Sequence, residues 1–219
     1  MTITVTYTDT IAVLNFGDGE NRFSLGFLDE INGHLDDIAS SGAGGLVTIG
    51  TGKFYSNGLD LDWLAAHGDQ TQWYVGRVQA LLARVLTLPI PTAAAIGGHS
   101  FGAAAMLAMA HDFRVMRADR GYFCFPEVDI RIPFTPGMAA LIQAKLTPQT
   151  AVAAMTTGRR FGGAEAAAAG IVDATAEEDA VVGAALNMLA PLGAKDPGTL
   201  GAIKNTMFAT VVAALRAVS

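Results

Sequence analysis

The stretch TAAAIGGHSFGAAAMLAMAHDFRVMR, residues 92–117, decides the fold class of this chain. An apolar run is followed by a glycine-rich turn, an alanine-rich helical segment and a second strand-like run, which is the pattern of a crossover connection between strands. From Val85 to His111 there is no Asp, Glu, Lys or Arg, a length that could span a bilayer. Two prolines and several glycines interrupt it, so we interpret it as a buried strand–turn–helix unit.

Strands and helices alternate on the N-terminal side of this stretch as well. Two runs of alternating polar and apolar residues, 2–7 and 10–16, predict a hairpin. Residues 24–40 place apolar side chains at helical spacing, and the wholly apolar LVTI (46–49) follows as a buried strand. Residues 73–88 predict another helix, which ends at a PIP sequence. This order predicts an α/β fold with crossover connections.

The C-terminal side is helical. Beyond about residue 136 helical patterns dominate, and residues 200–218 predict one amphipathic helix. We therefore expect a core domain over residues 1–175 and a helical C-terminal region over residues 176–219. A helical tail of this kind often packs on a neighbouring subunit, so an oligomer is expected.

Composition and charge argue against several classes of function. The chain has 219 residues, of which 51% are apolar, enough for a packed core. Its formal charge of −6 argues against nucleic acid as the main partner, because phosphate binding needs clustered Lys and Arg. Cys124 is the only cysteine, which excludes metal sites built on cysteine pairs and fits a reducing compartment. The ends match neither a signal peptide nor a peroxisomal address, so we expect a cytoplasmic location and no membrane insertion.

The segment GHSFG, residues 98–102, fits the G-x-S-x-G pattern of a nucleophilic serine between a strand and a helix. In α/β-hydrolases the triad follows the order Ser, acid, His. The only histidine after Ser100 is His111, and no Asp or Glu lies between them. That triad cannot be assembled, so we interpret Ser100 as a small polar residue in a tight glycine turn.

Two glycine turns, SNGLD (56–60) and HSFGAAAM (99–106), share a different property. Each follows a buried strand and starts a helix, where the first N–H groups lack internal partners and the dipole favours negative charge. Side by side, the amides of Leu59 and Ala103 would point at one place and form an oxyanion hole. The alternative is a pair of ordinary strand-to-helix turns.

A carboxylate in CFPEVDI, residues 124–130, is the third feature. Glu127 lies between apolar neighbours such as Phe125 and Pro126, and burial there would raise its pKa toward the range of a general base. The alternative is a glutamate at a strand end that faces water. On a strand, Asp129 would share a face with Glu127 and could assist it.

Four blocks, taken together and in this order, resemble the enoyl-CoA hydratase/isomerase (crotonase) superfamily: FYSNGLDL (54–61), IGGHSFGAAAMLAMAHDFRVM (96–116), FPEVDIRIPFTPG (125–137) and TTGRRFGGAEAAAAGIVDA (156–174). The resemblance covers about residues 3–175. The phrases SNGLDLDWL, RADRGYF and PEVDI are most similar to Δ3,Δ2-enoyl-CoA isomerases of the plant type. The resemblance implies a crotonase-like fold of repeated ββα units, a homotrimer or hexamer, and an acyl-CoA thioester substrate. No metal and no separate cofactor are expected, because coenzyme A is part of the substrate.

The resemblance also implies roles for individual residues. Leu59 and Ala103 match the two oxyanion amides of the family, and Glu127 matches its second catalytic glutamate. Arg22, Lys53 and Lys204 are the cations expected near the phosphates of coenzyme A. The residues expected to bind substrate are Arg22, Lys53, Ser56, Asn57, Gly58, Leu61, Phe101, Gly102, Met106 and Pro126.

The position of the family's first catalytic glutamate departs from the pattern, because Met106 occupies it in this sequence. Hydration in this family uses two carboxylates to hold and split water, whereas a double-bond shift needs one base between C2 and C4. The resemblance therefore favours an isomerase that uses Glu127 alone. An enoyl-CoA hydratase or another crotonase-type lyase, and a non-catalytic acyl-CoA-binding protein, are the alternatives.

Overall fold

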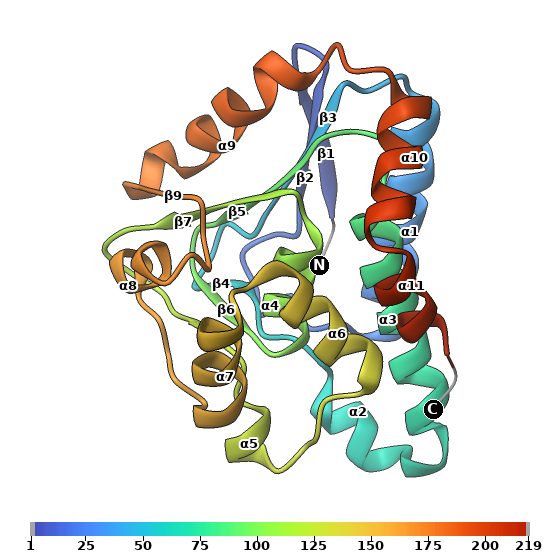
Figure 1. Ribbon diagram of the computed structural model, residues 1–219, viewed down its shortest axis with the longest axis vertical. Helices are drawn as coiled ribbons and strands as arrows, with labels where there is room; N and C mark the ends of the chain where they lie inside the picture. The colour runs from blue at the N-terminus through green and yellow to red at the C-terminus, as the bar shows by residue number, and fades with distance from the viewer. Residues whose placement is uncertain (1–2, 218–219) are drawn as a thin grey trace.

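The computed structural model describes residues 3–217 and forms two sheets wrapped by helices (Figure 1). The larger sheet has the strand order β1-β2-β3-β5-β7-β9, and the smaller one the order β4-β6-β8. The strands of the larger sheet are β1 (Thr4–Thr8), β2 (Ile11–Asn15), β3 (Gly45–Ile49), β5 (Thr92–Ile96), β7 (Phe113–Arg117) and β9 (Ala174–Ala176). Those of the smaller sheet are β4 (Phe54–Ser56), β6 (His99–Phe101) and β8 (Phe123–Cys124).

Helices connect and cover the strands. Those before the C-terminal region are α1 (Leu25–Ser40), α2 (Leu61–Ala66), the 3-10 turn η1 (Gly68–Gln70), α3 (Thr71–Leu86), α4 (Ala103–Ala110), α5 (Glu127–Ile130), α6 (Pro136–Lys145), α7 (Pro148–Thr157) and α8 (Gly163–Ala168). The C-terminal ones are η2 (Glu178–Ala180), α9 (Val181–Leu189), η3 (Ala190–Leu192), α10 (Pro197–Met207) and α11 (Ala209–Arg216).

The chain repeats one unit three times. The first strand of each unit (β3, β5, β7) joins the large sheet, the second (β4, β6, β8) joins the small sheet, and a helix follows. β1 and β2 pair antiparallel as the predicted hairpin, whereas the later neighbours in both sheets run parallel. Because the repeats run in parallel, the second strands end at the same side of the small sheet, and their helices begin there. The α/β prediction with ββα units is confirmed.

The alanine-rich unit at residues 92–117 lies at the centre of the molecule. All five residues of β5 and all eight of α4 are buried. Small side chains let α4 lie close under the strands, since Ala adds little width to a helix that is apolar on every side. Among the described residues, no single helix is long and apolar enough to cross a membrane.

The C-terminal region differs from the prediction of one helix over residues 200–218. Residues 197–216 form two helices, α10 and α11, which meet at an angle of 73°. Phe208 sits at the break with φ −109° and ψ 18°, and its side chain is buried. Burying this ring turns the chain back, so that α11 packs against α3 and α6. The expected domain boundary at residue 175 falls inside β9.

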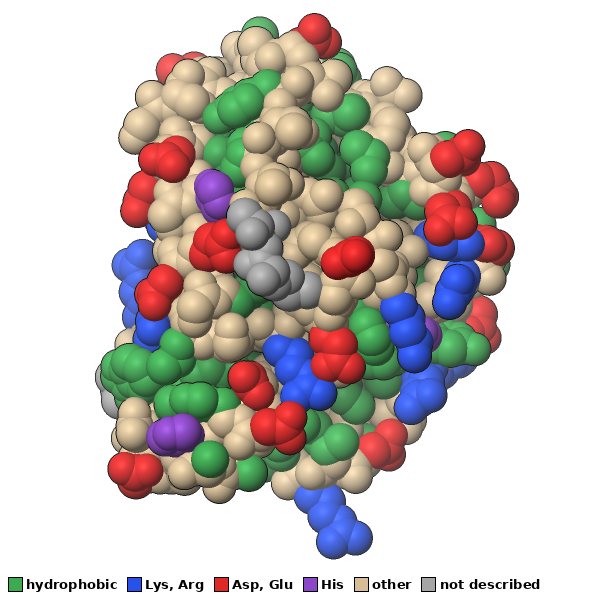
Figure 2. Space-filling view, turned by 180° about the vertical axis from the view of Figure 1, so that it is seen from behind, with side chains coloured by type: hydrophobic (Ala, Val, Ile, Leu, Met, Phe, Trp, Pro, Cys, Tyr) green, Lys and Arg blue, Asp and Glu red, His purple; other side chains and the backbone are tan. Residues whose placement is uncertain are grey.

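The surface on the rear face mixes the two signs of charge (Figure 2). Several Lys and Arg side chains gather at the right-hand edge of this view, with Asp and Glu side chains beside them. Ion pairs between neighbouring helices follow the same pattern: Arg77 of α3 pairs with Asp29 of α1, and Arg84 of α3 pairs with Asp36 of α1.

Candidate active site

The first glycine turn joins β4 to α2 through residues 57–60, Asn57 to Asp60. Gly58 has φ +80°, a conformation that residues with a side chain rarely adopt. A Cβ at Gly58 would lie 2.5 Å from the Phe101 carbonyl oxygen and 3.2 Å from the Ala103 nitrogen. Glycine is therefore required here for the chain to pass so close to the second turn.

The second turn joins β6 to α4 through Gly102, which has φ +55° and ψ −121°. Ala103 is the first residue of α4, so its amide belongs to the helix N-terminus and has no carbonyl partner within the helix. Because Gly58 approaches the Ala103 nitrogen, the two turns that the sequence singles out do lie side by side.

The amides of Leu59 and Ala103 are both free. Neither donates a hydrogen bond to another group between residues 3 and 217. The amides around Leu59 are bonded: Asn57 donates to the Glu20 carbonyl, and Gly58 donates to Ser56 Oγ. Unpaired N–H groups at a pocket wall are costly unless a ligand or solvent accepts from them, so these two amides are suited to bind an oxygen.

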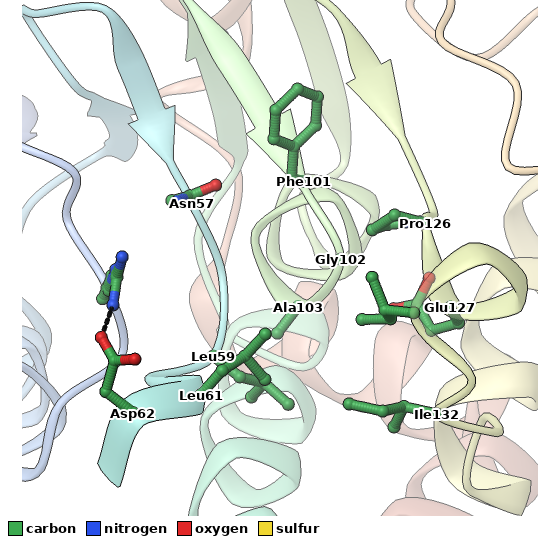
Figure 3. Close-up of a pocket in the computed structure, with 12 residues that line it drawn as sticks. Asn57, Leu59, Leu61, Asp62, Phe101, Gly102, Ala103, Pro126, Glu127 and Ile132 are labelled. Atoms are coloured by element: carbon green, nitrogen blue, oxygen red, sulfur yellow. Dashed lines mark hydrogen bonds and ion pairs between the residues drawn. The ribbon is translucent and has the colours of Figure 1, made fainter. Parts of the chain in front are cut away.

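Glu127 lies across from the two amides, at the first position of α5 (Figure 3). Its side chain is buried, with the residue 8% exposed, and its Oε2 has no hydrogen-bond partner among the described residues. A Cβ at Gly102 would lie 3.3 Å from Glu127 Oε1, so the carboxyl group lies against the second turn. Desolvation by burial raises the pKa of Glu127 to about 7. At neutral pH such a carboxylate can both accept and return a proton.

A pocket of about 300 Å³ joins these groups. Its walls are largely apolar, and its polar groups are the two free amides, the Glu127 carboxyl, Asn57 and the Arg22–Asp62 ion pair at one edge. Apolar walls with a few convergent polar groups are typical of a site that binds a small molecule. The lining residues are Arg22, Asn57, Leu59, Leu61, Asp62, Phe101, Gly102, Ala103, Pro126, Glu127, Ile130 and Ile132.

Four of the residues expected to bind substrate do not line this pocket. Ser56 is buried behind the first turn, where its Oγ accepts from the Gly58 amide and donates to the Asn21 carbonyl. Gly58 is buried within the turn, and Lys53 is exposed outside the pocket with its Nζ over the Phe54 ring. Met106 is 1% exposed and belongs to the hydrophobic core.

Two other ionisable residues have structural partners. Lys204, expected near phosphates, is buried and donates to Asp112 Oδ2 at 2.6 Å and to the Ile90 carbonyl at 2.8 Å. Asp112 also accepts from the amide and hydroxyl of Thr92. This pair therefore ties α10 to the start of β5 and lies outside the pocket.

Asp129 does not share a face with Glu127, which corrects the strand expectation. Residues 127–130 form the short helix α5, where positions two apart point in different directions. The Asp129 carboxylate instead lies against Gly158 at the end of α7, where an added Cβ would be 2.2 Å from Oδ2. Glu127 is consequently the one carboxylate that α5 contributes to the pocket.

The pocket also contains residues that the sequence did not single out: Asp62, Ile130 and Ile132. Arg22 bridges Glu20 and Asp62, with its Nη1 2.6 Å from Asp62 Oδ2. Asp62 lies at the edge of the pocket, and a dashed line marks its ion pair (Figure 3). The Asp62 side chain is 88% exposed. Ile130 and Ile132 are apolar residues near the surface, and this exposure is visible only in the structure.

Ser100 has no histidine partner. Its side chain is buried, and its Oγ makes no hydrogen bond to the described residues. His111 is occupied elsewhere: Nδ1 donates to the Leu107 carbonyl, and Nε2 accepts from Thr48 Oγ1. The structure thus gives no support to a hydrolytic serine.

Known proteins match this chain over most of its length. The family model described as enoyl-CoA hydratase/isomerase matches residues 6–219. The chain is 36% identical to the peroxisomal enoyl-CoA delta isomerase 2 of Arabidopsis thaliana, over 82% of this chain and 79% of the relative. It is 37% identical to enoyl-CoA delta isomerase 3 of the same plant, with the same two coverages.

Solved structures show the same fold. The probable enoyl-CoA hydratase of Mycobacterium tuberculosis has a TM-score of 0.93 at 26% identity, covering 100% of this chain and 93% of that one. The human mitochondrial delta3-delta2-enoyl-CoA isomerase has a TM-score of 0.88 at 24% identity, covering 97% of this chain and 85% of that one. The crotonase-like fold expected from the sequence is confirmed. By its fold, its glycine turns and these matches, the chain belongs to the enoyl-CoA hydratase/isomerase family.

Proposed function

We propose that this protein is a Δ3,Δ2-enoyl-CoA isomerase, which moves a double bond of an acyl-CoA thioester into conjugation with the carbonyl group. The observation that carries the proposal is the pairing of two free amides, from Leu59 and Ala103, with a single buried carboxylate, Glu127. The similarity to the two plant enoyl-CoA delta isomerases supports it.

In this mechanism the thioester oxygen accepts hydrogen bonds from Leu59 and Ala103. Glu127 removes a proton from C2, and the negative charge that develops on the oxygen is stabilised by the two amides as an enolate. One well-placed donor of this kind contributes about 3 kcal/mol to the transition state. The protonated Glu127 then delivers the proton to C4, so one group serves as base and acid in turn.

The pKa of Glu127 suits this task. With a pKa near 7, a large part of Glu127 is ionised at neutral pH. This carboxylate is basic enough to take the C2 proton, whose loss the two oxyanion amides assist. The Oε2 atom has no hydrogen-bond partner among residues 3–217, so a substrate C–H group can approach it. An ordinary exposed glutamate, with its lower pKa, would be a weaker base.

The main alternative is hydration of a 2-enoyl thioester, which needs two carboxylates around one water molecule. Asp62 is the other carboxylate at the pocket, but it is exposed and paired with Arg22. A paired, solvated carboxylate is a poor base for water. A relative in Citrobacter koseri, 31% identical to this chain, is named carnitinyl-CoA dehydratase, which is the reason to test this alternative.

Supplying 3-enoyl-CoA and 2-enoyl-CoA separately tests the two reactions. The proposal predicts formation of conjugated 2-enoyl-CoA from the first substrate and little 3-hydroxyacyl-CoA from the second. Rapid hydration of 2-enoyl-CoA, with no turnover of 3-enoyl-CoA, would favour the hydratase. Binding of both without turnover would favour the non-catalytic alternative.

Three further features belong to the same proposal. The phosphates of coenzyme A would meet Arg22 at the pocket edge and Lys53 on the adjoining surface. The assembly would be a homotrimer or hexamer, and the location cytoplasmic. Size-exclusion chromatography with light scattering tests the assembly, and Lys53→Ala, which should raise KM without lowering kcat, tests the phosphate contact.

A further inference from the structure

The direction of the Leu59 amide is set by its neighbours in the peptide chain. A peptide group is planar and trans, so its C=O and N–H bonds point in opposite directions. The Gly58 carbonyl, which shares a peptide group with the Leu59 N–H, accepts from the Phe23 amide at 2.8 Å. Fixing that carbonyl toward Phe23 therefore turns the Leu59 N–H the opposite way, into the pocket.

Tyr74 of α3 completes a closed ring around Leu59. Its Oη accepts from the Asp60 amide at 2.9 Å and donates to the Phe23 carbonyl at 2.7 Å. Three hydrogen bonds close the ring: the Phe23 N–H donates to the Gly58 carbonyl, the Asp60 N–H donates to the Tyr74 hydroxyl, and that hydroxyl donates to the Phe23 carbonyl. The chain from Gly58 through Leu59 to Asp60 completes it. Both peptide groups that flank Leu59 are thus held, while its N–H donates to no acceptor in the part of the chain that the structure describes.

Tyr74 is well suited to this position. It is fully buried, and its ring packs 5.1 Å from Trp63 of α2. Burial raises the pKa of Tyr74 to about 12, so its hydroxyl stays protonated and can donate and accept at once over the working pH range. It does not line the pocket, so it can act on substrate only through the turn.

We propose that Tyr74 is a positioning residue: its hydroxyl, bonded to Asp60 and Phe23, aims the Leu59 amide at the substrate oxygen. This inference rests on the proposed isomerase function. Without the hydroxyl, the Asp60 amide and the Phe23 carbonyl lose their shared partner, and the turn can rotate. The donor would then be misaligned where charge develops, which affects the transition state more than the bound substrate.

The test is Tyr74→Phe, with Tyr55→Phe as a matched control. Tyr55 is also fully buried, and its hydroxyl bonds Thr48, away from the turn. Tyr74→Phe should lower kcat on 3-enoyl-CoA by about 10- to 100-fold with KM changed less than about threefold. Tyr55→Phe should keep kcat within about twofold while lowering the melting temperature.

A second readout reports the oxyanion hole without turnover. Bound hexanoyl-CoA, which has no double bond to move, should show a thioester C=O stretch shifted to lower frequency in difference infrared spectra. Tyr74→Phe should reverse part of that shift, and Tyr55→Phe should not. If Tyr74→Phe does not fold, 3,5-difluorotyrosine at position 74 keeps the ring and both partners but weakens the hydroxyl as an acceptor, and a smaller change in both readouts is expected.

The outcomes separate the two proposals. Wild-type kcat and wild-type carbonyl shift in folded Tyr74→Phe would overturn the positioning role while leaving the isomerase intact. A wild-type protein with neither turnover nor a shifted carbonyl would overturn the function and the positioning role together. A fall in kcat with the carbonyl shift reversed supports both.

Discussion

Gly102 and Glu127 lie so close that the glycine's missing side chain leaves room for the carboxyl group. A Cβ at Gly102 would be 3.3 Å from Glu127 Oε1, and the glycine has φ +55°. The turn that supplies the Ala103 amide therefore also lies directly against the carboxyl group of Glu127. The two chemical parts of the site are coupled through this single residue.

Gly102→Ala should impair the site more than it destabilises the fold. The added methyl would push on Glu127 Oε1 and strain the turn, at a cost of about 1–3 kcal/mol. We expect kcat to fall by about 10- to 100-fold, because small displacements of reacting groups are costly. Gly170→Ala is the matched control, since Gly170 also has a positive φ of +68° but open space around it. Equal loss of activity in both variants would contradict the coupling.

Glu127→Gln should abolish turnover while keeping binding. Glutamine fills the same volume but cannot accept the C2 proton, so kcat should fall by at least about 10³-fold. Isothermal titration with hexanoyl-CoA should give a Kd within a few-fold of wild type. Retention of substantial activity would show that another group is the base.

Activity should depend on pH through Glu127. The base acts as the carboxylate, and its pKa is about 7, so kcat/KM should rise with pH to a plateau, with a midpoint near 7. The measurement is a pH series of kcat/KM on 3-enoyl-CoA in buffers of constant ionic strength. A midpoint near the ordinary glutamate value of 4.5 would mean that the carboxyl is not desolvated in the working enzyme.

The contribution of Glu127 to the free energy of unfolding should fall as pH rises, whereas activity rises with pH. Folding raises the pKa of Glu127 from 4.5 to about 7, so the folded protein binds the proton more tightly than the unfolded chain. This contribution is full below about pH 4.5 and is lost as pH rises through 7. Relative to wild type, Glu127→Gln should therefore gain about 2–3 kcal/mol in free energy of unfolding between pH 5 and pH 8. Urea titrations of both proteins at pH 5 and pH 8 measure these free energies. The same difference between variant and wild type at both pH values would contradict the burial of the Glu127 carboxyl group.

Met106→Glu should destabilise the protein without creating a hydratase. Met106 is in the core and does not line the pocket, so a carboxylate there would be buried without a partner. We expect a loss of about 3 kcal/mol or more in the free energy of unfolding. Met106→Leu, the control, should cost less than about 1.5 kcal/mol. A stable Met106→Glu protein that hydrates 2-enoyl-CoA would refute this placement.

The parts of the molecule that follow from local sequence were predictable. The glycine and alanine pattern of residues 92–117 defines a buried strand, a turn and a helix, and two such turns imply two free amides. Asp60 precedes α2 and caps it, since its Oδ1 accepts from the Trp63 amide. For Glu127 the sequence left two alternatives, a buried carboxylate and one facing water, and the residue is buried at 8% exposed.

Other parts depend on tertiary contacts that no local pattern encodes. EVDI (127–130) is four residues long, too short to reveal a helical period, so the sequence does not predict the helix and a strand interpretation puts Asp129 on the same face as Glu127. No Gly or Pro marks the break at Phe208, which follows from the burial of its ring. Met106 lies in the core because of the way α4 packs. Its alignment with the family's first catalytic glutamate does not predict this burial.

Transfer of an isotope label tests the central claim most directly. With 3-enoyl-CoA dideuterated at C2, in single turnovers, one base that carries the proton from C2 to C4 should leave deuterium at C4 of the 2-enoyl-CoA product, and Glu127→Gln should form no product. NMR and mass spectrometry of the product measure the label. Label at C4 above the level of solvent exchange is the predicted result. Conversion to 3-hydroxyacyl-CoA, or product formation by Glu127→Gln at the wild-type rate, would contradict the account.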